Sequence, residues 1–344
     1  VGGGGDNVAN VFVVATNRPF VNFDSGSGDE FDELTLSNVG NERNTLGMFG
    51  AGYIELLARE MTADLIQIRT TALQEAKKSG EPVNRQLITK GVDFGAIMAH
   101  PSGGVDTSQI EGVDEDLIIK PFSQKGALVS IRDFTIEAMN VHHGMQASER
   151  FFGGLTDDPN FPFDPDGDEV INELTAGDIT AVTLFQATLP VPAFVLPENK
   201  EAQQAAKAGF GVFNDIGCNS CHISQLPLEN TFFTEPNPWN PPLTYRKSDG
   251  SPSYSVNLDS LEVNPSDYGS KTVVWVPAFT DLKRHDMGSI LDNEKREQAT
   301  HLGPTLDNET QERVAQSEQL IQNGLDTLAD IPTDEWLTRK LWGF

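Results

Sequence analysis

The residues best suited to chemistry in this sequence are two cysteines and the histidine that follows them. Cys218 and Cys221 are the only cysteines of the chain, and His222 comes next, so the stretch reads Cys-x-x-Cys-His. Two thiols at this spacing can form thioethers with the vinyl groups on one edge of a porphyrin, and the adjacent histidine can bind the iron. The spacing therefore predicts one covalently attached haem c, with His222 as axial ligand.

Two other interpretations of the cysteine pair stay open, a redox dithiol and half of a zinc site. A thioredoxin-like dithiol needs a strand-to-helix turn in a βαβ unit, and the flanking sequence does not indicate one. A zinc site needs at least two further ligands, and the chain has no other cysteine to offer. We therefore expect haem and keep both alternatives.

A second group of candidate ligands lies downstream, in residues 281–288. We expect this stretch to be a loop that faces the haem and supplies the sixth iron ligand, Met287 in preference to His285, because a thioether favours reduced iron. Lys283 and Arg284 are expected to pair with the haem propionates. The alternative is that His285 forms a local hydrogen bond and Met287 packs in the core.

The acidic stretch 164–175 matches the beginning of a calcium-binding loop. Acidic residues stand at its first, third and fifth positions, whereas the twelfth is Thr175 in place of glutamate. The alternative is an acidic surface turn that binds no ion. The expected calcium ligands are Asp164, Asp166, Asp168, and Asn172 or Glu173.

Helices are expected to position these groups. Apolar residues at helical spacing predict a long helix that starts near residue 54 and stops at Gly80, and a second helix over 130–145. A third is expected over 179–188, capped by Asp178. Small and aromatic residues over 205–213 predict a helix that walls the haem.

The rest of the sequence predicts few strands and one domain boundary. Residues 80–125 are expected to be irregular or short-stranded, and residues 273–276 to form a short strand. Three prolines between residues 190 and 197 mark a linker. We therefore expect an N-terminal domain over 1–195 and a C-terminal haem domain over 196–344.

The charge of the chain limits its partners. The net charge is −27 over 344 residues, which argues against nucleic acid and anionic membrane surfaces as partners and favours a basic redox protein or another cytochrome. The sequence has no apolar run long enough to span a membrane. Covalent haem attachment takes place outside the cytoplasm in bacteria, so we expect a periplasmic or extracellular location. Oligomer formation is left open.

Five stretches together point to one protein family, residues 46–55, 164–175, 213–222, 281–288 and 337–343. The chain resembles the bacterial di-haem oxidoreductases related to di-haem cytochrome c peroxidases. The resemblance implies a mainly α-helical fold with long irregular loops and cytochrome c-like haem domains, the first of them reduced to a remnant in residues 1–195. It also implies electron exchange between two haems, although this sequence contains one Cys-x-x-Cys-His.

Three functions are compatible with the sequence. The first is a haem oxidoreductase of peroxidase type, whose iron has an open site for substrate. The second is a pure electron-transfer cytochrome with both axial positions filled, and the third is a haem-bearing subunit of a larger extracellular assembly. The sixth ligand separates the first two, because Met or His in that position closes the iron.

Overall fold

The structure is a computed structural model, and it describes most of the chain between residues 47 and 288. The expected calcium ligands Asp164, Asp166 and Asp168 lie outside the described residues. The described residues are 6–8, 41–43, 47–143, 145, 147–149, 172–192, 195–241, 244–246, 250, 252–258, 265–268, 271–288 and 335–341.

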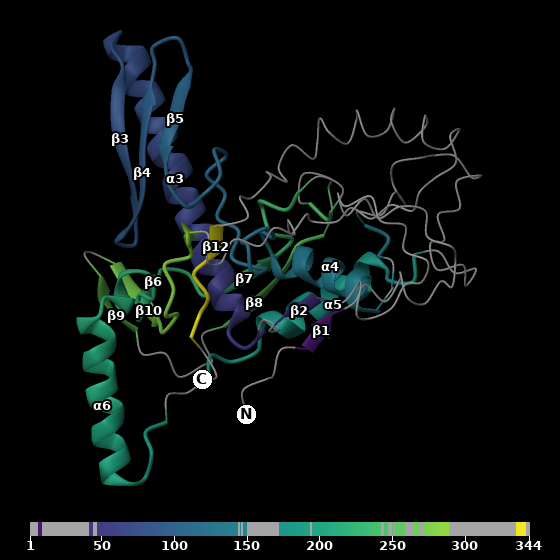
Figure 1. Cartoon of the computed structure of the whole chain (residues 1–344). Helices are drawn as coiled ribbons and strands as arrows, with labels where there is room; N and C mark the ends of the chain where they lie inside the picture. The colour runs from purple at the N-terminus through teal and green to yellow at the C-terminus, as the bar shows by residue number, and fades with distance from the viewer. Residues whose placement is uncertain are drawn as a thin grey trace, which may run out of the picture.

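The described chain combines helices with small antiparallel sheets (Figure 1). The helices are α3 (Ala51–Ser79), α4 (Ile131–His143), α5 (Ala176–Ala187), α6 (Lys200–Asp215) and the short 3₁₀ helix η1 (Cys218–Ser220). The sheets are β1 (Asp6–Val8) with β2 (Asn41–Arg43); β3 (Val83–Thr89), β4 (Val92–Ala99) and β5 (Val105–Ile110); β6 (Leu226–Leu228), β10 (Lys271–Val276) and β9 (Pro265–Tyr268); β7 (Phe232–Glu235) with β8 (Tyr254–Asn257); and β11 (Arg284–Asp286) with β12 (Glu335–Leu337).

The expectation of a mainly α-helical fold with cytochrome c-like haem domains is wrong. In the described residues four α-helices stand beside twelve strands, and after residue 195 a single α-helix, α6, accompanies seven strands. The β3–β4 hairpin shows one physical reason. Its two-residue turn, Lys90 and Gly91, has φ values of 50° and 83°, and turns with two positive φ angles match the twist of paired strands. Alternating burial along β3 and β4 then favours a sheet over irregular chain.

The longest helix, α3, confirms the helix expected to end at Gly80. Its 29 residues span about 44 Å. Gly80 ends it with a φ of 74°, and its N–H donates to the carbonyl of Ala76, a C-terminal cap that glycine adopts without strain. The first half of α3 is buried in the body, and the second half lies along β3, β4 and β5 to form a projecting arm (Figure 1).

One apolar core connects the segments on either side of the expected domain boundary. Tyr53 and Met61 of α3 belong to the same buried cluster as Leu226, Phe233 and Val276. The Tyr53 hydroxyl also donates a hydrogen bond to the carbonyl of Leu258. The boundary near residue 195 therefore stays a prediction, and these contacts show that the two segments pack against each other.

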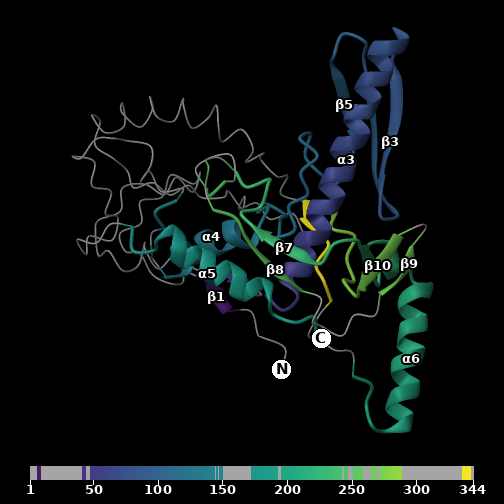
Figure 2. The same ribbon diagram turned by 180° about the vertical axis from the view of Figure 1, so that it is seen from behind.

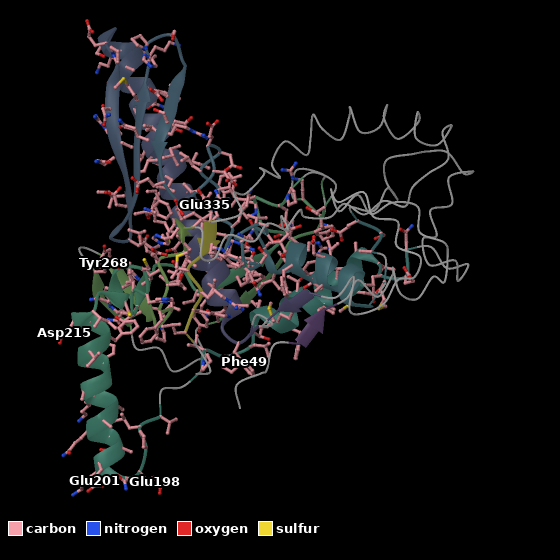
Figure 3. All side chains as sticks on the ribbon, viewed as in Figure 1. Phe49, Glu198, Glu201, Asp215, Tyr268 and Glu335 are labelled. Carbon is pink, nitrogen blue, oxygen red and sulfur yellow. The ribbon has the colours of Figure 1, made fainter. Side chains whose placement is uncertain are left out.

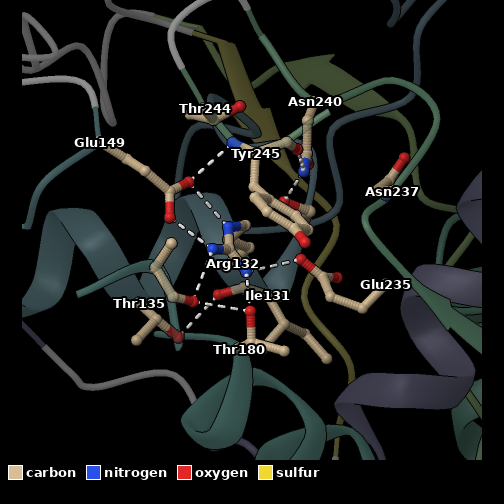
Figure 4. A network of polar contacts seen from close by, with 12 residues as sticks. Ile131, Arg132, Thr135, Glu149, Thr180, Glu235, Asn237, Asn240, Thr244 and Tyr245 are labelled. Carbon is tan, nitrogen blue, oxygen red and sulfur yellow. Dashed lines mark hydrogen bonds and ion pairs between the residues drawn. The ribbon is translucent and has the colours of Figure 1, made fainter. Parts of the chain in front are cut away.

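A buried ion network joins α4, α5 and β7 (Figure 4). Arg132 of α4 is fully buried. Its Nε donates to Glu149 Oε2 over 2.8 Å, and its Nη1 donates to both Glu235 Oε1 and Thr180 Oγ1 over 2.9 Å. The guanidinium also lies 4.6 Å from the centre of the Tyr245 ring. Two carboxylates and a hydroxyl thus compensate one buried cation.

A third buried carboxylate, Glu55, extends this polar region into α3. One of its oxygens accepts hydrogen bonds from Arg59 and, over 2.7 Å, from Asn237. The other accepts the backbone N–H of Ile131 over 2.7 Å, at the first residue of α4. Glu55 therefore caps α4 from another helix, an interaction favoured by the positive end of the helix dipole.

No helix in the described ranges is both long enough and apolar enough to cross a lipid bilayer.

Candidate haem-binding site

The Cys-x-x-Cys-His stretch forms one tight turn directly after α6. Gly217 has a φ of 85° and precedes η1, a conformation in which glycine avoids the clash that a side chain would cause. The backbone N–H of His222 donates to the carbonyl of Cys218 over 2.9 Å. Both cysteines are free and half-buried. The two thiols and the imidazole therefore arise from a single turn, as attachment to one porphyrin edge requires.

A backbone carbonyl sets the orientation of the His222 ring. Nδ1 of His222 lies 2.9 Å from the carbonyl oxygen of Phe279. Because a carbonyl oxygen can only accept, Nδ1 carries the proton, and Nε2 keeps its lone pair. Metal-binding histidines are commonly fixed in this way, with one nitrogen donating to the protein and the other bound to the metal. His222 thus fits the role of an axial ligand.

Aromatic side chains border His222. The Phe213 ring centre is 6.3 Å from that of His222 and 6.5 Å from that of Phe279. Phe210 stacks on Phe213 at 6.1 Å. The helix expected over 205–213 is thus confirmed as α6, and its aromatic residues do lie next to the Cys-x-x-Cys-His turn.

Helix α6 is otherwise open to solvent. It contains no buried residue, and it projects from the edge of the β9–β10 sheet when the molecule is seen from behind (Figure 2). Its side chains, from Glu201 at one end to Asp215 at the other, point into the surroundings (Figure 3). Phe210 is 48% exposed and the following Ile216 is 70% exposed. An apolar surface therefore lies beside the candidate attachment site.

A second set of reactive side chains surrounds Cys221. Its Sγ lies 3.9 Å from Nδ1 of His285, and Nε2 of His285 lies 2.7 Å from Oδ2 of Asp281. The three residues offer ligand atoms that all lie within 4.8 Å of one another. Residues 281–285 therefore do reach the Cys-x-x-Cys-His turn, with His285 as the contacting side chain.

Met287, the residue preferred as the sixth ligand, lies just beyond β11. Its side chain is 49% exposed. His285 instead sits within β11, where it pairs with Trp336 of β12. Either residue as the sixth iron ligand stays a prediction.

The two cations expected at the haem propionates have other partners. Lys283 Nζ donates to the carbonyl of Asp93 over 2.6 Å. Arg284 pairs with Asp114 and lies 3.6 Å from a carboxylate oxygen of Glu335, which stands where the arm meets the body (Figure 3). The pair between Arg284 and Asp114 ties β11 to the segment before α4. A propionate role for Lys283 and Arg284 stays a prediction that these contacts do not support.

The described end of the acidic stretch has one feature of an ion site. Asn172 has a φ of 58°, and its Oδ1 is buried without a hydrogen-bond partner among the described residues. A buried carbonyl oxygen of this kind suits a cation ligand. Glu173 also lies in the described part, half-buried.

The start of α5 differs from expectation by three residues. Thr175 is the N-cap, and Asp178 completes a capping box by accepting the backbone N–H of Thr175 over 3.0 Å. The sequence pattern Thr-x-x-Asp is a recognisable form of this motif. Asp178 thus acts inside the first turn rather than before it.

Sequence reasoning missed the positioning residues of the site. The carbonyl of Phe279 carries no side-chain signal, and Asp281 was expected only as the edge of a loop.

No family model, no curated protein and no solved structure matches this chain. The site must therefore be interpreted from its own geometry.

Proposed function

We propose that this chain binds one haem covalently through Cys218 and Cys221 and transfers electrons outside the cytoplasm, as a c-type cytochrome of the di-haem oxidoreductase type. The observation that carries the proposal is the Cys-x-x-Cys-His turn with Nδ1 of His222 held 2.9 Å from the Phe279 carbonyl. This hydrogen bond directs the lone pair of Nε2 away from the backbone, as an axial ligand needs. A bound haem would supply a one-electron couple at its iron.

The residues of the chain anchor, orient and shield such a group. The two thiols would anchor one edge of a porphyrin, and His222 would bind its iron. Phe213 and Phe279 supply apolar walls next to His222. The exposed apolar side chains of Phe210 and Ile216 offer further surface that a flat hydrophobic ring would remove from water.

Electron relay is favoured over substrate oxidation when Met287 or His285 fills the sixth position. A peroxidase-type reaction instead requires that this position stay open, and a haem-bearing subunit without catalysis is the third alternative. The net charge of −27 favours a basic redox partner, because opposite charges steer the encounter of two proteins. A second haem is implied by the resemblance to the di-haem family, whereas this sequence contains one Cys-x-x-Cys-His.

The test is expression of the full chain in a bacterial host that attaches haem c, followed by intact mass and a pyridine haemochrome spectrum. We expect the mass of the chain plus one haem, which stays with the denatured protein after acid–acetone extraction. Cys221→Ala should leave one thioether and shift the haemochrome band, whereas His100→Ala, in the turn after β4, should not. Complete loss of haem from the extracted wild type would contradict covalent attachment.

A zinc site is the second candidate, because Cys221, Asp281 and His285 offer ligand atoms within 4.8 Å of one another. Thiolate, carboxylate and imidazole suit zinc with a water in the fourth position. Elemental analysis separates the candidates. Stoichiometric zinc in haem-free protein, lost in His285→Ala, would favour zinc over haem.

A further inference from the structure

Lys340 places its amine against the body of the protein, shortly after the end of β12. Its Nζ donates a hydrogen bond to the carbonyl of Phe49 over 3.0 Å, just before α3 begins. Phe49 lies at the lower edge of the body (Figure 3). Lys340 is half-buried, and its side chain is among those that line a small pocket. The hydrogen bond therefore fixes a lysine amine beside a pocket.

Most of the pocket wall is apolar. Met48 and Ile54 contribute from the chain that enters α3, Phe122 from the segment before α4, and Leu282 and Leu337 from the region of β11 and β12. An amine at such a wall loses part of the water that stabilises its ammonium form. The pocket thus favours the neutral, nucleophilic form of the amine.

The backbone that carries Lys340 is fixed on both sides of the pocket. The N–H of Leu337 donates to the carbonyl of Gln124 over 3.1 Å, and the N–H of Thr338 donates to the carbonyl of Lys283 over 3.0 Å. These bonds tie β12 to two separate segments of the body. The pocket and its lysine are therefore built by the fold and do not depend on a ligand to form.

Two cations share this pocket. Among the described residues that line it, Arg339 and Lys340 are the charged ones. Burial and, after it, the charge of Arg339 lower the pKa of Lys340 to about 7. Burial also lowers the pKa of Arg339. An anion that enters the pocket would relieve the repulsion between the two side chains.

The acidic groups of the neighbouring elements lie against other partners. They are Asp281 with His285, Glu55 with Arg59, Asp114 with Lys120, and Glu335 with Arg284. The negative charge that best complements the pocket is thus one that a ligand brings.

We propose that Lys340 is a nucleophilic amine that forms an imine with a small α-keto acid, whose carboxylate pairs with Arg339. Lysines become nucleophilic in an apolar pocket or beside another cation, and both conditions hold here. The lone pair of Nζ forms a bond to the keto carbon, and the keto oxygen leaves as water with the two amine hydrogens, so nothing is oxidised or reduced. The guanidinium group matches a carboxylate through two parallel hydrogen bonds. This site is independent of the proposed haem function.

The main test traps the imine in the full-length chain. The protein is incubated with pyruvate and sodium cyanoborohydride, which reduces an imine to a stable secondary amine, and mass spectrometry of peptides quantifies the adduct at each lysine. An ordinary lysine is almost wholly protonated at about pH 7, so Lys340 should be modified about tenfold more than Lys207 on the exposed α6. Equal modification of the two lysines in the wild-type chain would overturn the proposal.

Variants test the role of the carboxylate. Lys340→Met should remove the adduct from its peptide and leave that of Lys207 unchanged, whereas Lys207→Met should keep the adduct at Lys340. Methyl pyruvate carries the same keto group without the negative charge. Arg339→Gln should therefore lower modification by pyruvate about tenfold more than modification by methyl pyruvate. An equal fall with both reagents would overturn the assignment of an α-keto acid.

The pH dependence of acetylation gives a readout that needs no keto acid. With acetic anhydride, the rate at Lys340 should rise to half its maximum near pH 7, as the pKa of about 7 requires, and then level off. Arg339→Gln should move this midpoint upward, because the repulsion is gone. Circular dichroism checks the fold of each variant, and the wild-type profile decides if a variant does not fold. A wild-type midpoint near the ordinary lysine value of about 10.4 would overturn the proposal.

Discussion

Glu235 is a fully buried carboxyl group that lies between two arginines and a second glutamate. Burial and the nearby Glu55 raise the pKa of Glu235 to about 7, although Arg132 and Arg59 act in the opposite direction. Its Oε2 has no hydrogen-bond partner among the described residues. Proton uptake by this oxygen therefore relieves both the buried charge and the repulsion from Glu55.

This raised pKa predicts a pH-dependent stability. The ordinary pKa is 4.5, so between this value and about 7 the folded protein binds more protons at Glu235 than the unfolded chain does. The free energy of unfolding must then fall as the pH rises through this window and level off above it. The loss is on the order of 3 kcal/mol for a shift of this size.

Glu235→Gln should remove most of this slope, because glutamine does not titrate. Urea unfolding of the wild type and the variant at about pH 5 and about pH 8 measures it. Glu201→Gln, on the exposed α6, is the control and should keep the wild-type slope. A variant with the full wild-type slope would contradict the assignment to Glu235.

Calcium binding is the second prediction at this scale. If Asn172 and the acidic residues before it hold an ion, a chelator should lower the melting temperature, on the order of 5 °C for an ion that saturates its site. Asn172→Ala should melt near the chelated wild type and respond little to chelator. Asn214→Ala, exposed at the end of α6, should respond like the wild type. An unchanged melting temperature, with no calcium by elemental analysis, would exclude the ion.

Among the glycines within the described helices, Gly52 of α3 has the closest backbone neighbour, which belongs to the end of α5. A Cβ atom on Gly52 would lie 2.2 Å from the carbonyl oxygen of Ala187 and 2.9 Å from a methyl carbon of Leu258. Backbone cannot move aside as a side chain can, so the helices must separate if this position gains a methyl group.

Gly52→Ala should therefore lower the free energy of unfolding by about 1–3 kcal/mol or more. Gly209→Ala is the matched variant, since it also lies within a helix and a Cβ atom there meets nothing within 4 Å. It should raise stability by about 0.5–1 kcal/mol, because alanine favours the helix. Urea unfolding compares the two. Equal effects in both variants would show that α3 and α5 do not approach closely.

The helices were predictable because their spacing is a local signal. Ile54, Leu57 and Met61 repeat at helical intervals, and α3 follows them as expected. The β3–β4 hairpin lies in residues 80–125, which were expected to be irregular or short-stranded, and its local signal is the turn Lys90-Gly91 between residues of alternating burial. The exposure of α6 could not be predicted, because the apolar face of a helix does not indicate which other element packs against it.

The site was predictable only in part, because the spacing within a short motif is a local signal and contacts between distant residues are not. The spacing of Cys218, Cys221 and His222 is local and indicates haem from sequence alone. Their positioning groups are distant. The carbonyl of Phe279 lies 57 residues from His222 along the chain, and His285 lies 64 residues from Cys221. Such contacts depend on the tertiary fold, which no spacing rule supplies.

For the whole molecule, the segment before α6 is the expected site of proteolysis. Val195 is 80% exposed, and α6 buries none of its residues, so little packing protects this region. Contacts nevertheless join the chain before this segment to the chain after it. Arg59 Nη1 donates to the carbonyl of Thr234 over 2.7 Å, and the apolar core includes residues from both parts of the chain.

Limited proteolysis should thus cut first between residues 190 and 200, and the two fragments should stay together. We expect two bands on a denaturing gel and one peak in native size-exclusion chromatography. Urea should separate the fragments. Native separation without urea would indicate two independent domains, and a first cut within 205–225 would contradict the expected boundary.

The buried network around Arg132 has a consequence for the history of this protein. Loss of one partner leaves a buried charge without compensation, at about 3–5 kcal/mol, whereas joint replacement by apolar residues can be neutral. Arg132 holds both Glu149 and Glu235, so replacement of Arg132 alone would leave two buried carboxyl groups without their cation, whereas replacement of one glutamate leaves Arg132 paired with the other. Descendants of an ancestral chain should therefore lose Arg132 only together with its glutamates, and sets that lack Arg132 alone should be rare in diverging lineages.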